Sequence, residues 1–424
     1  MPTRALLEAG SRARSAEGSM LAVVLAADAN GLGAVRNLAA ARIPTVAVVL
    51  SATQLARFSR FARKCVVPGN GDQETSLLLA LEGLPEPAVL LPTSDCFVRF
   101  LLKHHDLLAR RFAMAMPPRE LTRELLDKAR QAQLASAIGV PLPATVHDLP
   151  AKAGELGRML PFPMILKPRS AEQERRFGHK NIVVGCLEDL EAVFQAHSQM
   201  LDGLIAQECI PGDDGALWVC DCVFGRNSEL VSAFTFRKLR TSPAHFGVSS
   251  LAVSERNERL VDLAQRLGKK LGYVGPADFD FKYDARDGQY KYLEVNPRLG
   301  MCNMFAARCG INSVVDAYRV AAGYPVSPLP QQTQGAVYLN LYDDLRCRLK
   351  DGERPTAILR SYLELAGRRW VGPMFSWSDP LPGIYGAWRN LLGAASGLRR
   401  RWRPIRKGPG GAFRAGPRQQ ELSR

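Results

Sequence analysis

Two short segments near residue 290, in which polar and apolar residues alternate, constrain the fold of this chain more than any other feature. The first is Asp-Phe-Asp-Phe-Lys around Asp280, and the second is Tyr-Leu-Glu-Val-Asn-Pro-Arg at 292–298. The stretch Asp-Ala-Arg-Asp-Gly at 284–288 lies between them, and this composition predicts a β-hairpin. Because side chains alternate along a strand, we expect Glu294 and Asn296 on one face, opposite Leu293 and Val295.

The polar face of this hairpin carries oxygen ligands. A carboxylate on one strand (Asp280) and a carboxylate plus an amide on the next (Glu294 and Asn296) would form an all-oxygen site. Such a site suits Mg²⁺ that also holds nucleotide phosphates, and Mn²⁺ could replace it. The alternative interpretation is a hairpin whose polar residues simply face solvent.

The hairpin resembles the metal-binding hairpin of the ATP-grasp superfamily, in the carboxylate–amine ligase branch similar to D-aspartate ligase. The resemblance covers residues 20–330, and Asp280 stands where Glu is commoner. It implies ATP and Mg²⁺ as cofactors. It also implies an α/β fold in which a Rossmann-like pre-ATP-grasp domain at 20–120 precedes an ATP-grasp domain at 121–330, whose two α+β subdomains clasp ATP.

The hydrophobic pattern of the first hundred residues agrees with that expectation. Near-continuous apolar runs at 21–26, 44–50 and 88–92 predict buried strands of a parallel sheet. We expect a glycine-containing turn at 28–33 before a helix at 35–42. A second helix, at 121–138, should lead into the next domain.

Several residues are candidates for ATP binding. Lys167 ends an apolar strand, where a buried lysine is costly unless an anion meets it, and phosphate is a natural partner. The resemblance implies that Lys128 also contacts the phosphates. It further implies an adenine site at 205–212 and ribose contacts from one of two adjacent acids, so the remaining candidates are Gln207, Glu208, Ile210, Asp213 and Asp214.

Basic residues at 237–240 suit the triphosphate. Lys238 and Arg240 are the candidates for neutralising the transferred γ-phosphate, and the loop 246–250 resembles the family's loop near the phosphates. The expected loop 169–180 contains a single glycine where relatives often have several. Its cations Arg175, Arg176 and Lys180 could act as point charges, or the loop could be a mobile lid.

The parts imply a reaction. A carboxylate would be activated by ATP as an acyl phosphate, and an amine or a thiol would then displace phosphate. Arg298 is the candidate for holding the carboxylate, because its planar guanidinium grips such groups bidentately, and Asn303 is expected in the same pocket. The partners would be small-molecule carboxylate and amine substrates.

Net charge separates the C-terminal region from the rest. The chain carries +15, and residues 346–424 hold 17 Lys and Arg against 5 Asp and Glu, which gives +12 there. Specific nucleic-acid binding is therefore not expected of the whole protein. We expect a helical extension at 331–398, a disordered basic tail at 399–424 and a disordered extension at 1–19. The alternative function is an ATP-binding protein with a degenerate site that contacts anionic membranes or a scaffold through this tail.

The nine cysteines do not form the spacing of a metal site, and a reducing cytoplasm accounts for them. No apolar run reaches the roughly 20 residues that span a bilayer. The sequence carries no feature that fixes an oligomeric state.

Overall fold

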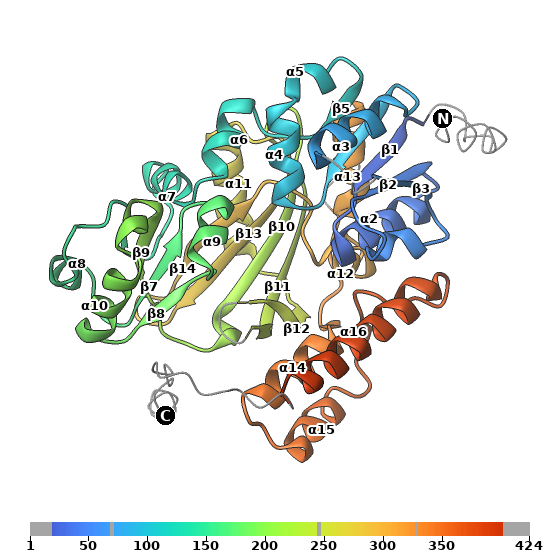
Figure 1. Ribbon diagram of the computed structural model, residues 1–424. Helices are drawn as coiled ribbons and strands as arrows, with labels where there is room; N and C mark the ends of the chain where they lie inside the picture. Colours follow the sequence, from blue (N-terminus) through green and yellow to red (C-terminus); the bar gives the residue numbers. More distant parts are fainter. Residues whose placement is uncertain (1–18, 68–71, 244–246, 327–329, 402–424) are drawn as a thin grey trace.

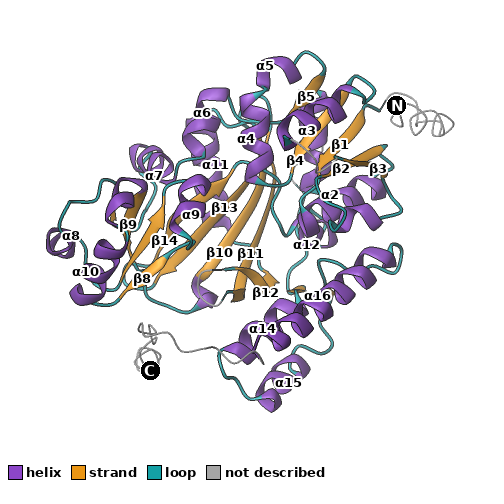
Figure 2. Ribbon diagram, in the orientation of Figure 1, coloured by secondary structure: helices purple, strands orange, loops and turns teal. Residues whose placement is uncertain are grey.

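The structure is a computed structural model that describes residues 19–67, 72–243, 247–326 and 330–401, with side chains up to residue 393 in the last helix. Three sheets organise these residues (Figures 1 and 2): a five-stranded sheet near the N-terminus, a four-stranded sheet and a seven-stranded sheet. Residues 1–18 of the extension expected at 1–19, and residues 402–424 of the tail expected at 399–424, lie outside the described residues.

The N-terminal sheet is parallel throughout, in the order β3-β2-β1-β4-β5. Its strands β1, β2 and β4 are almost wholly apolar and buried, as the sequence predicted for a sheet covered on both faces. The elements are β1 (Leu21–Leu25), β2 (Thr45–Val49), β3 (Arg63–Val66), β4 (Ala88–Pro92), β5 (Phe112–Met114), α2 (Asp28–Ala40), η1 (Leu55–Phe58), α3 (Gln73–Glu82), α4 (Asp95–Lys103) and α5 (His105–Leu108).

The expected turn at 28–33 is wrong, because these residues form the first turns of α2. Gly31 explains how a helix fits there. A Cβ at this position would lie 2.5 Å from the Cα of Ala26, so only glycine lets the helix start against the end of β1.

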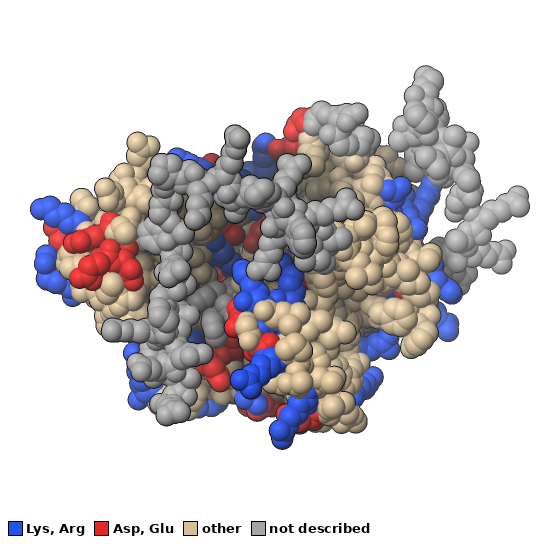
Figure 3. Space-filling model, turned by 60° about the horizontal axis from the view of Figure 1, so that its bottom comes forward, with Lys and Arg blue, Asp and Glu red and all other residues tan. Residues whose placement is uncertain are grey.

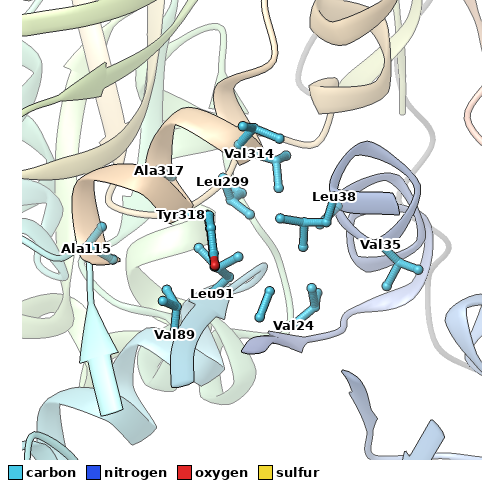
Figure 4. Close-up of a cluster of buried hydrophobic side chains, with 14 of the residues drawn as sticks. Val24, Val35, Leu38, Val89, Leu91, Ala115, Leu299, Val314, Ala317 and Tyr318 are labelled. Atoms are coloured by element: carbon cyan, nitrogen blue, oxygen red, sulfur yellow. The ribbon is translucent and has the colours of Figure 1, made fainter. Parts of the chain in front are cut away.

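One hydrophobic cluster joins this sheet to the rest of the molecule. Val24 and Leu91 of β1 and β4 pack with Val314 and Tyr318 of α13 (Ser313–Ala322), as Figure 4 shows. All four side chains are at most 2% exposed. Apolar burial of this kind stabilises by roughly 25 cal/mol per Å² of area removed from water, so α13 fixes the N-terminal sheet to the large sheet.

The small sheet is antiparallel, in the order β6-β9-β7-β8. Along β7, Met164 and Leu166 pack under α8 and α10, whereas Ile165 and Lys167 face the other way. The elements are β6 (Thr145–Val146), β7 (Met164–Pro168), β8 (Ile182–Val184), β9 (Leu204–Glu208), α8 (Ala153–Met159), α9 (Ala171–Phe177), α10 (Leu187–Ala196) and η2 (Ser198–Gly203).

The large sheet has the order β14-β13-β10-β11-β12-β15-β16 and is antiparallel except for its last pair. Its apolar face packs on α11, α6 and α7, and the opposite face meets α12 and α13 at one end. The elements are η3 (Asp214–Ala216), β10 (Leu217–Phe224), β11 (Leu230–Ser242), β12 (Val248–Ser254), α11 (Glu258–Leu271), β13 (Gly275–Asp284), β14 (Gln289–Asn296), α12 (Asn303–Arg308), β15 (Val337–Leu339) and β16 (Trp370–Val371).

The single helix expected at 121–138 is two helices, α6 (Arg119–Leu125) and α7 (Lys128–Ala137). Asp127 separates them. Its side chain accepts hydrogen bonds from the backbone N–H groups of Ala129 and Arg130, at 2.8 and 3.2 Å, and so caps α7. Lys128 consequently stands in the first turn of a new helix.

The region expected as a helical extension contains α14 (Leu341–Lys350), α15 (Pro355–Leu363) and α16 (Pro380–Arg401), together with β15 and β16 of the large sheet. The start of the expected tail, residues 399–401, belongs to α16. Arg36 of α2 holds this region through a buried ion pair, with its Nε 3.0 Å from Asp379 Oδ2. None of the described helices combines the length and apolar character that crossing a membrane requires.

Candidate active site

A cavity of about 420 Å³ lies between the small sheet and the large sheet. Both sheets turn polar residues into it, and the first residue of α4 contributes from the N-terminal sheet. The charged and amide residues that line it are Asp95, Lys128, Lys167, Glu174, Lys180, Asn181, Gln207, Glu208, Lys238, Asp278, Asp280, Lys282, Glu294, Asn296 and Arg298.

The predicted hairpin supplies the floor of this cavity. Asp280 of β13 pairs with Glu294 of β14, and Asp278 pairs with Asn296. The turn has a 2.8 Å bond from the Gly288 N–H to the Asp284 carbonyl. The strands therefore bring Asp280, Glu294 and Asn296 onto one surface.

Strict alternation predicted Leu293 on the face opposite Glu294, and this prediction is wrong. The register shifts between Asp280 and Phe281, which pair with Glu294 and Tyr292, so Leu293 is an extra residue in β14. A β-bulge of this kind places two consecutive side chains on the same side of a strand. Leu293 and Glu294 both line the cavity as a result.

The donor set fits a hard divalent cation. In the part of the chain that the structure describes, no three His, Cys, Asp or Glu side chains are grouped as a metal site. Two carboxylates and an amide at Asp280, Glu294 and Asn296 would thus need further oxygen ligands. Mg²⁺ commonly takes one or two carboxylates and completes its shell with water and substrate phosphates.

Lysines surround these carboxylates. Lys238 Nζ lies 2.6 Å from Asp280 Oδ1, and Lys128 Nζ lies 3.9 Å from Glu294 Oε2. Burial opposes the ionisation of Glu294, but Lys128, Lys180 and Lys167 outweigh it and lower its pKa to about 2. Glu294 is therefore a carboxylate at any physiological pH.

Burial lowers the pKa of Lys167, whereas burial alone would raise the pKa of Glu294. Desolvation disfavours the charged form of Lys167 and lowers its pKa to about 8, despite the opposing effect of Glu294. Its Nζ donates a 2.7 Å hydrogen bond to Gln207 Oε1. A partly desolvated lysine at the end of a strand gains most from a phosphate nearby.

The segment expected at adenine begins in β9, an interior strand of the small sheet, and continues beyond the end of that strand. Gln207, Glu208 and Ile210 all line the cavity. The N–H of Glu208 already donates to Ala144, at 2.9 Å, whereas that of Ile210 has no acceptor among the described residues.

Asp213 and Asp214 do not line the cavity. Asp213 accepts from the Gly215 N–H at 2.9 Å, and Asp214 accepts from the N–H and hydroxyl of Thr241 at 2.8 Å each. Both acids brace the backbone around η3 in the described arrangement.

The three cations at 237–240 go to three different places. Lys238 enters the cavity, and Arg237 pairs with Glu255 at 3.2 Å. A bulge between Lys238 and Arg240 changes the register of β11. Arg240 lies outside the cavity lining and makes two bonds, of 2.8 and 2.9 Å, to the carboxylate of Asp344 in α14.

The segment 169–180 is mostly the helix α9 and not a loop. Ser170 caps it, and Gly178 ends it in the left-handed conformation, at φ +78°. Of its three predicted cations, Lys180 lines the cavity, whereas Arg175 and Arg176 do not. Gly247 and the first two residues of β12, Val248 and Ser249, also line the cavity.

Arg298 lies between two carboxylates. Its Nε is 3.0 Å from Asp95 Oδ1, and its Nη1 is 3.5 Å from Asp278 Oδ2.

Asn303, which was expected in the same pocket as Arg298, does not line the cavity and is fully buried against α2. Its Nδ2 donates to Asn30 Oδ1 at 2.6 Å, and its Oδ1 accepts from Asn37, so it fastens α12 to α2.

Comparisons with known proteins indicate the family of this chain. The family model for the carbamoyl-phosphate synthase L chain ATP binding domain matches residues 242–329, which include the hairpin. D-aspartate ligase of Enterococcus faecium is 26% identical over an alignment of 313 positions that covers 68% of this chain and 74% of that protein. The chain belongs to the ATP-grasp superfamily.

Solved structures show the ATP-grasp fold at lower identity. The biotin carboxylase domain of Hydrogenobacter thermophilus 2-oxoglutarate carboxylase, in complex with MgADP, ADP and bicarbonate, has a TM-score of 0.60 at 15% identity, covering 75% of this chain and 73% of that chain. N5-carboxyaminoimidazole synthetase from Staphylococcus aureus, complexed with ADP, has a TM-score of 0.61 at 13% identity, covering 79% and 86%.

Four charged residues of this ATP-grasp cavity, Asp95, Glu174, Asp278 and Lys282, were not among the predicted ones. Asp278 and Lys282 flank Asp280 on the same face of β13, so the alternation that selected Asp280 also marks them. Burial and the neighbouring Asp280 raise the pKa of Asp278 to about 6. Lys282 Nζ donates to the Gly212 carbonyl at 3.0 Å.

Proposed function

We propose that this ATP-grasp protein is an ATP-dependent ligase that joins a carboxylate to an amine, with a thiol as the alternative nucleophile. One observation carries the proposal: the oxygen donors Asp280, Glu294 and Asn296 face Lys167 and Lys128 across a single cavity. Cations for phosphates and ligands for a divalent metal thus meet in one space.

Chemically, a substrate carboxylate oxygen attacks the γ-phosphorus of ATP. The bond from that phosphorus to the β–γ bridging oxygen breaks, and ADP leaves. The amine nitrogen then attacks the carbonyl carbon of the acyl phosphate, inorganic phosphate departs, and the nitrogen gives up one proton to water. Bound Mg²⁺ would neutralise phosphate charge and orient the phosphates.

Some residues of this chain would bind the nucleotide, and others would bind the carboxylate. Lys167 and Lys128 would hold phosphate oxygens, Lys238 would offset charge on the transferred group, and the Ile210 backbone would meet adenine. Arg298, which is mostly buried beside Asp95, would orient the carboxylate. We do not assign Arg240, Asp213 or Asp214 a direct contact with ATP.

Hydroxylamine provides the test, because it converts an acyl phosphate into a hydroxamate, which iron(III) turns into a coloured complex, whatever the natural nucleophile is. Purified protein, MgATP and hydroxylamine would be mixed with the twenty amino acids and common carboxylic acids in turn. We expect hydroxamate and ADP in equal amounts with at least one carboxylate, and none with Glu294→Gln. Exposed Glu258→Gln is the matched control. No hydroxamate with a broad panel would contradict the proposal.

The alternative, a degenerate site with a membrane or scaffold role, depends on the basic tail. Most of that tail lies outside the described residues. On the face shown in Figure 3, Lys and Arg side chains lie beside Asp and Glu side chains. The complete donor set in the cavity favours the ligase.

A further inference from the structure

A second chamber adjoins the candidate active site. It has a volume of about 490 Å³ and shares five lining residues with the first cavity, including Asp95, Arg298 and Ser249. One wall comes from the N-terminal sheet and α2. The other comes from α14, α16 and the segment before α16, which lie together beside α2 in Figure 1.

The C-terminal wall lies outside the part of the chain that matches the family model, which ends at residue 329. Asn340, Tyr342, Asp343 and Arg389 are among the residues of this wall. The region is firmly attached, because Arg389 makes two 3.0 Å bonds to the carboxylate of Asp28 in the opposite wall. The C-terminal region is therefore fixed against the N-terminal sheet at this chamber.

Three carboxylates from three elements line the chamber: Asp28, Asp95 and Asp343. Two of them have a cation in hydrogen-bond contact, since Asp28 bonds Arg389 and Asp95 bonds Arg298 at 3.0 Å. Asp343 is different. Its close partner is the uncharged amide of Asn340 at 2.8 Å, and its ion pair with the exposed Arg346 is longer, at 3.6 Å.

Two further features belong to residues that line the chamber. The Oδ1 atom of Asn340 is buried and has no hydrogen-bond partner among the described residues. Asp28 has φ +38°, a left-handed conformation that residues with a Cβ rarely adopt. Backbone strain of this kind is concentrated at functional sites.

We propose that this chamber binds the nucleophile of the ligase as a protonated primary amine, with Asp343 as its counter-ion. The inference rests on the proposed function and adds the site and the charge of the second substrate. The chamber joins the nucleotide cavity at Arg298, so the amine approaches the activated carboxylate from the side opposite the nucleotide. One proton leaves the ammonium for water before nitrogen attacks carbon.

The test compares Asp343→Asn with Asp351→Asn, an exposed acid just after the end of the same helix. Each variant removes one negative charge from one helix. The first assay uses hydroxylamine, which is uncharged at neutral pH, with the carboxylate that gives hydroxamate. The second assay replaces hydroxylamine with ammonia, 1,5-diaminopentane and the amino acids, and then follows the best of these amines by phosphate release.

We expect Asp343→Asn to raise the half-saturating amine concentration by about tenfold while the hydroxamate rate stays within about twofold of the wild type. Asp351→Asn should change neither value. Equal amine saturation in both variants would overturn the inference, as would a change in the carboxylate's half-saturation in place of the amine's. Hydroxamate without any active amine would also overturn it. Loss of hydroxamate in the wild type would instead refute the proposed function.

Discussion

The Nζ atom of Lys238 lies 2.6 Å from Oδ1 of Asp280, so a candidate phosphate-binding cation directly contacts a candidate metal ligand. Burial disfavours the charge on Lys238, but Asp280 outweighs this effect and raises its pKa. Any cation bound by Asp280 must share that carboxylate with the lysine. The strength of metal binding and the handling of phosphate charge are thereby coupled.

This coupling predicts opposite effects of one substitution. Lys238→Met should lower turnover by about a hundredfold or more, because an electrostatic contact to the transferred group is lost. It should also reduce the Mg²⁺ concentration that gives half-maximal nucleotide binding, because Asp280 no longer has a competing partner. Phosphate release would measure the first effect, and metal titrations monitored by nucleotide binding would measure the second. The exposed Lys269→Met is the control, and weaker Mg²⁺ binding in Lys238→Met would refute the coupling.

Arg240 should matter for stability more than for ATP. Its guanidinium is bound by Asp344, whose side chain is fully buried and also accepts from Ser250 and Tyr362. Removing one partner of a buried pair costs about 3–5 kcal/mol, because the other charge stays buried. Denaturant unfolding of Arg240→Ala should show this loss, with a nearly unchanged KM for ATP.

The companion variant Arg240→Leu with Asp344→Leu should recover part of that stability, since no lone charge is then buried. One outcome would instead support the γ-phosphate role that the sequence predicted for Arg240. If Arg240→Ala abolished turnover at full stability, Arg240 would act on the γ-phosphate after all.

Nucleotide binding should weaken above about pH 8. Lys167 has a pKa of about 8, below its ordinary value, because burial disfavours its charge. The protonated form is the one that attracts phosphate, and its population falls as pH rises through that value. The affinity for ADP should therefore be lower at pH 9 than at pH 7. Lys167→Arg keeps its charge and should show a flatter profile, whereas an equally flat wild-type profile would contradict this assignment.

Arg298 should affect the carboxylate more than the nucleotide. Arg298→Lys keeps a positive charge near Asp95 and Asp278 but loses the planar guanidinium. We expect a higher KM for the carboxylate in the hydroxamate assay and little change in the KM for ATP. If the two KM values rose together, Arg298 would act on the site as a whole and not on the carboxylate.

The sequence was sufficient to predict the hairpin and the parallel sheet, because both follow from local alternation and from continuous apolar runs. It predicted Lys167 for a physical reason that the structure shares, a lysine at the end of a buried strand. Asp278 was within reach of the same reasoning, since it stands two residues before Asp280 on the same face.

Other features could not be read from local pattern. The bulges at Leu293 and in β11 change which side chains share a face, and they depend on pairing with the neighbouring strand. The partner of Arg240 lies 104 residues away, in α14. Asn303 likewise acquires its role from α2, through contacts that only the folded chain brings together.

Calorimetric titration of ATP into the protein, with Mg²⁺ and with EDTA, tests the central claim most directly. If Asp280, Glu294 and Asn296 hold a metal that bridges to the phosphates, binding should be at least about tenfold tighter with Mg²⁺ in the wild type. Glu294→Gln should lose this difference while keeping its thermal unfolding midpoint. Equal affinity for ATP with Mg²⁺ and with EDTA in the wild-type protein would contradict the account.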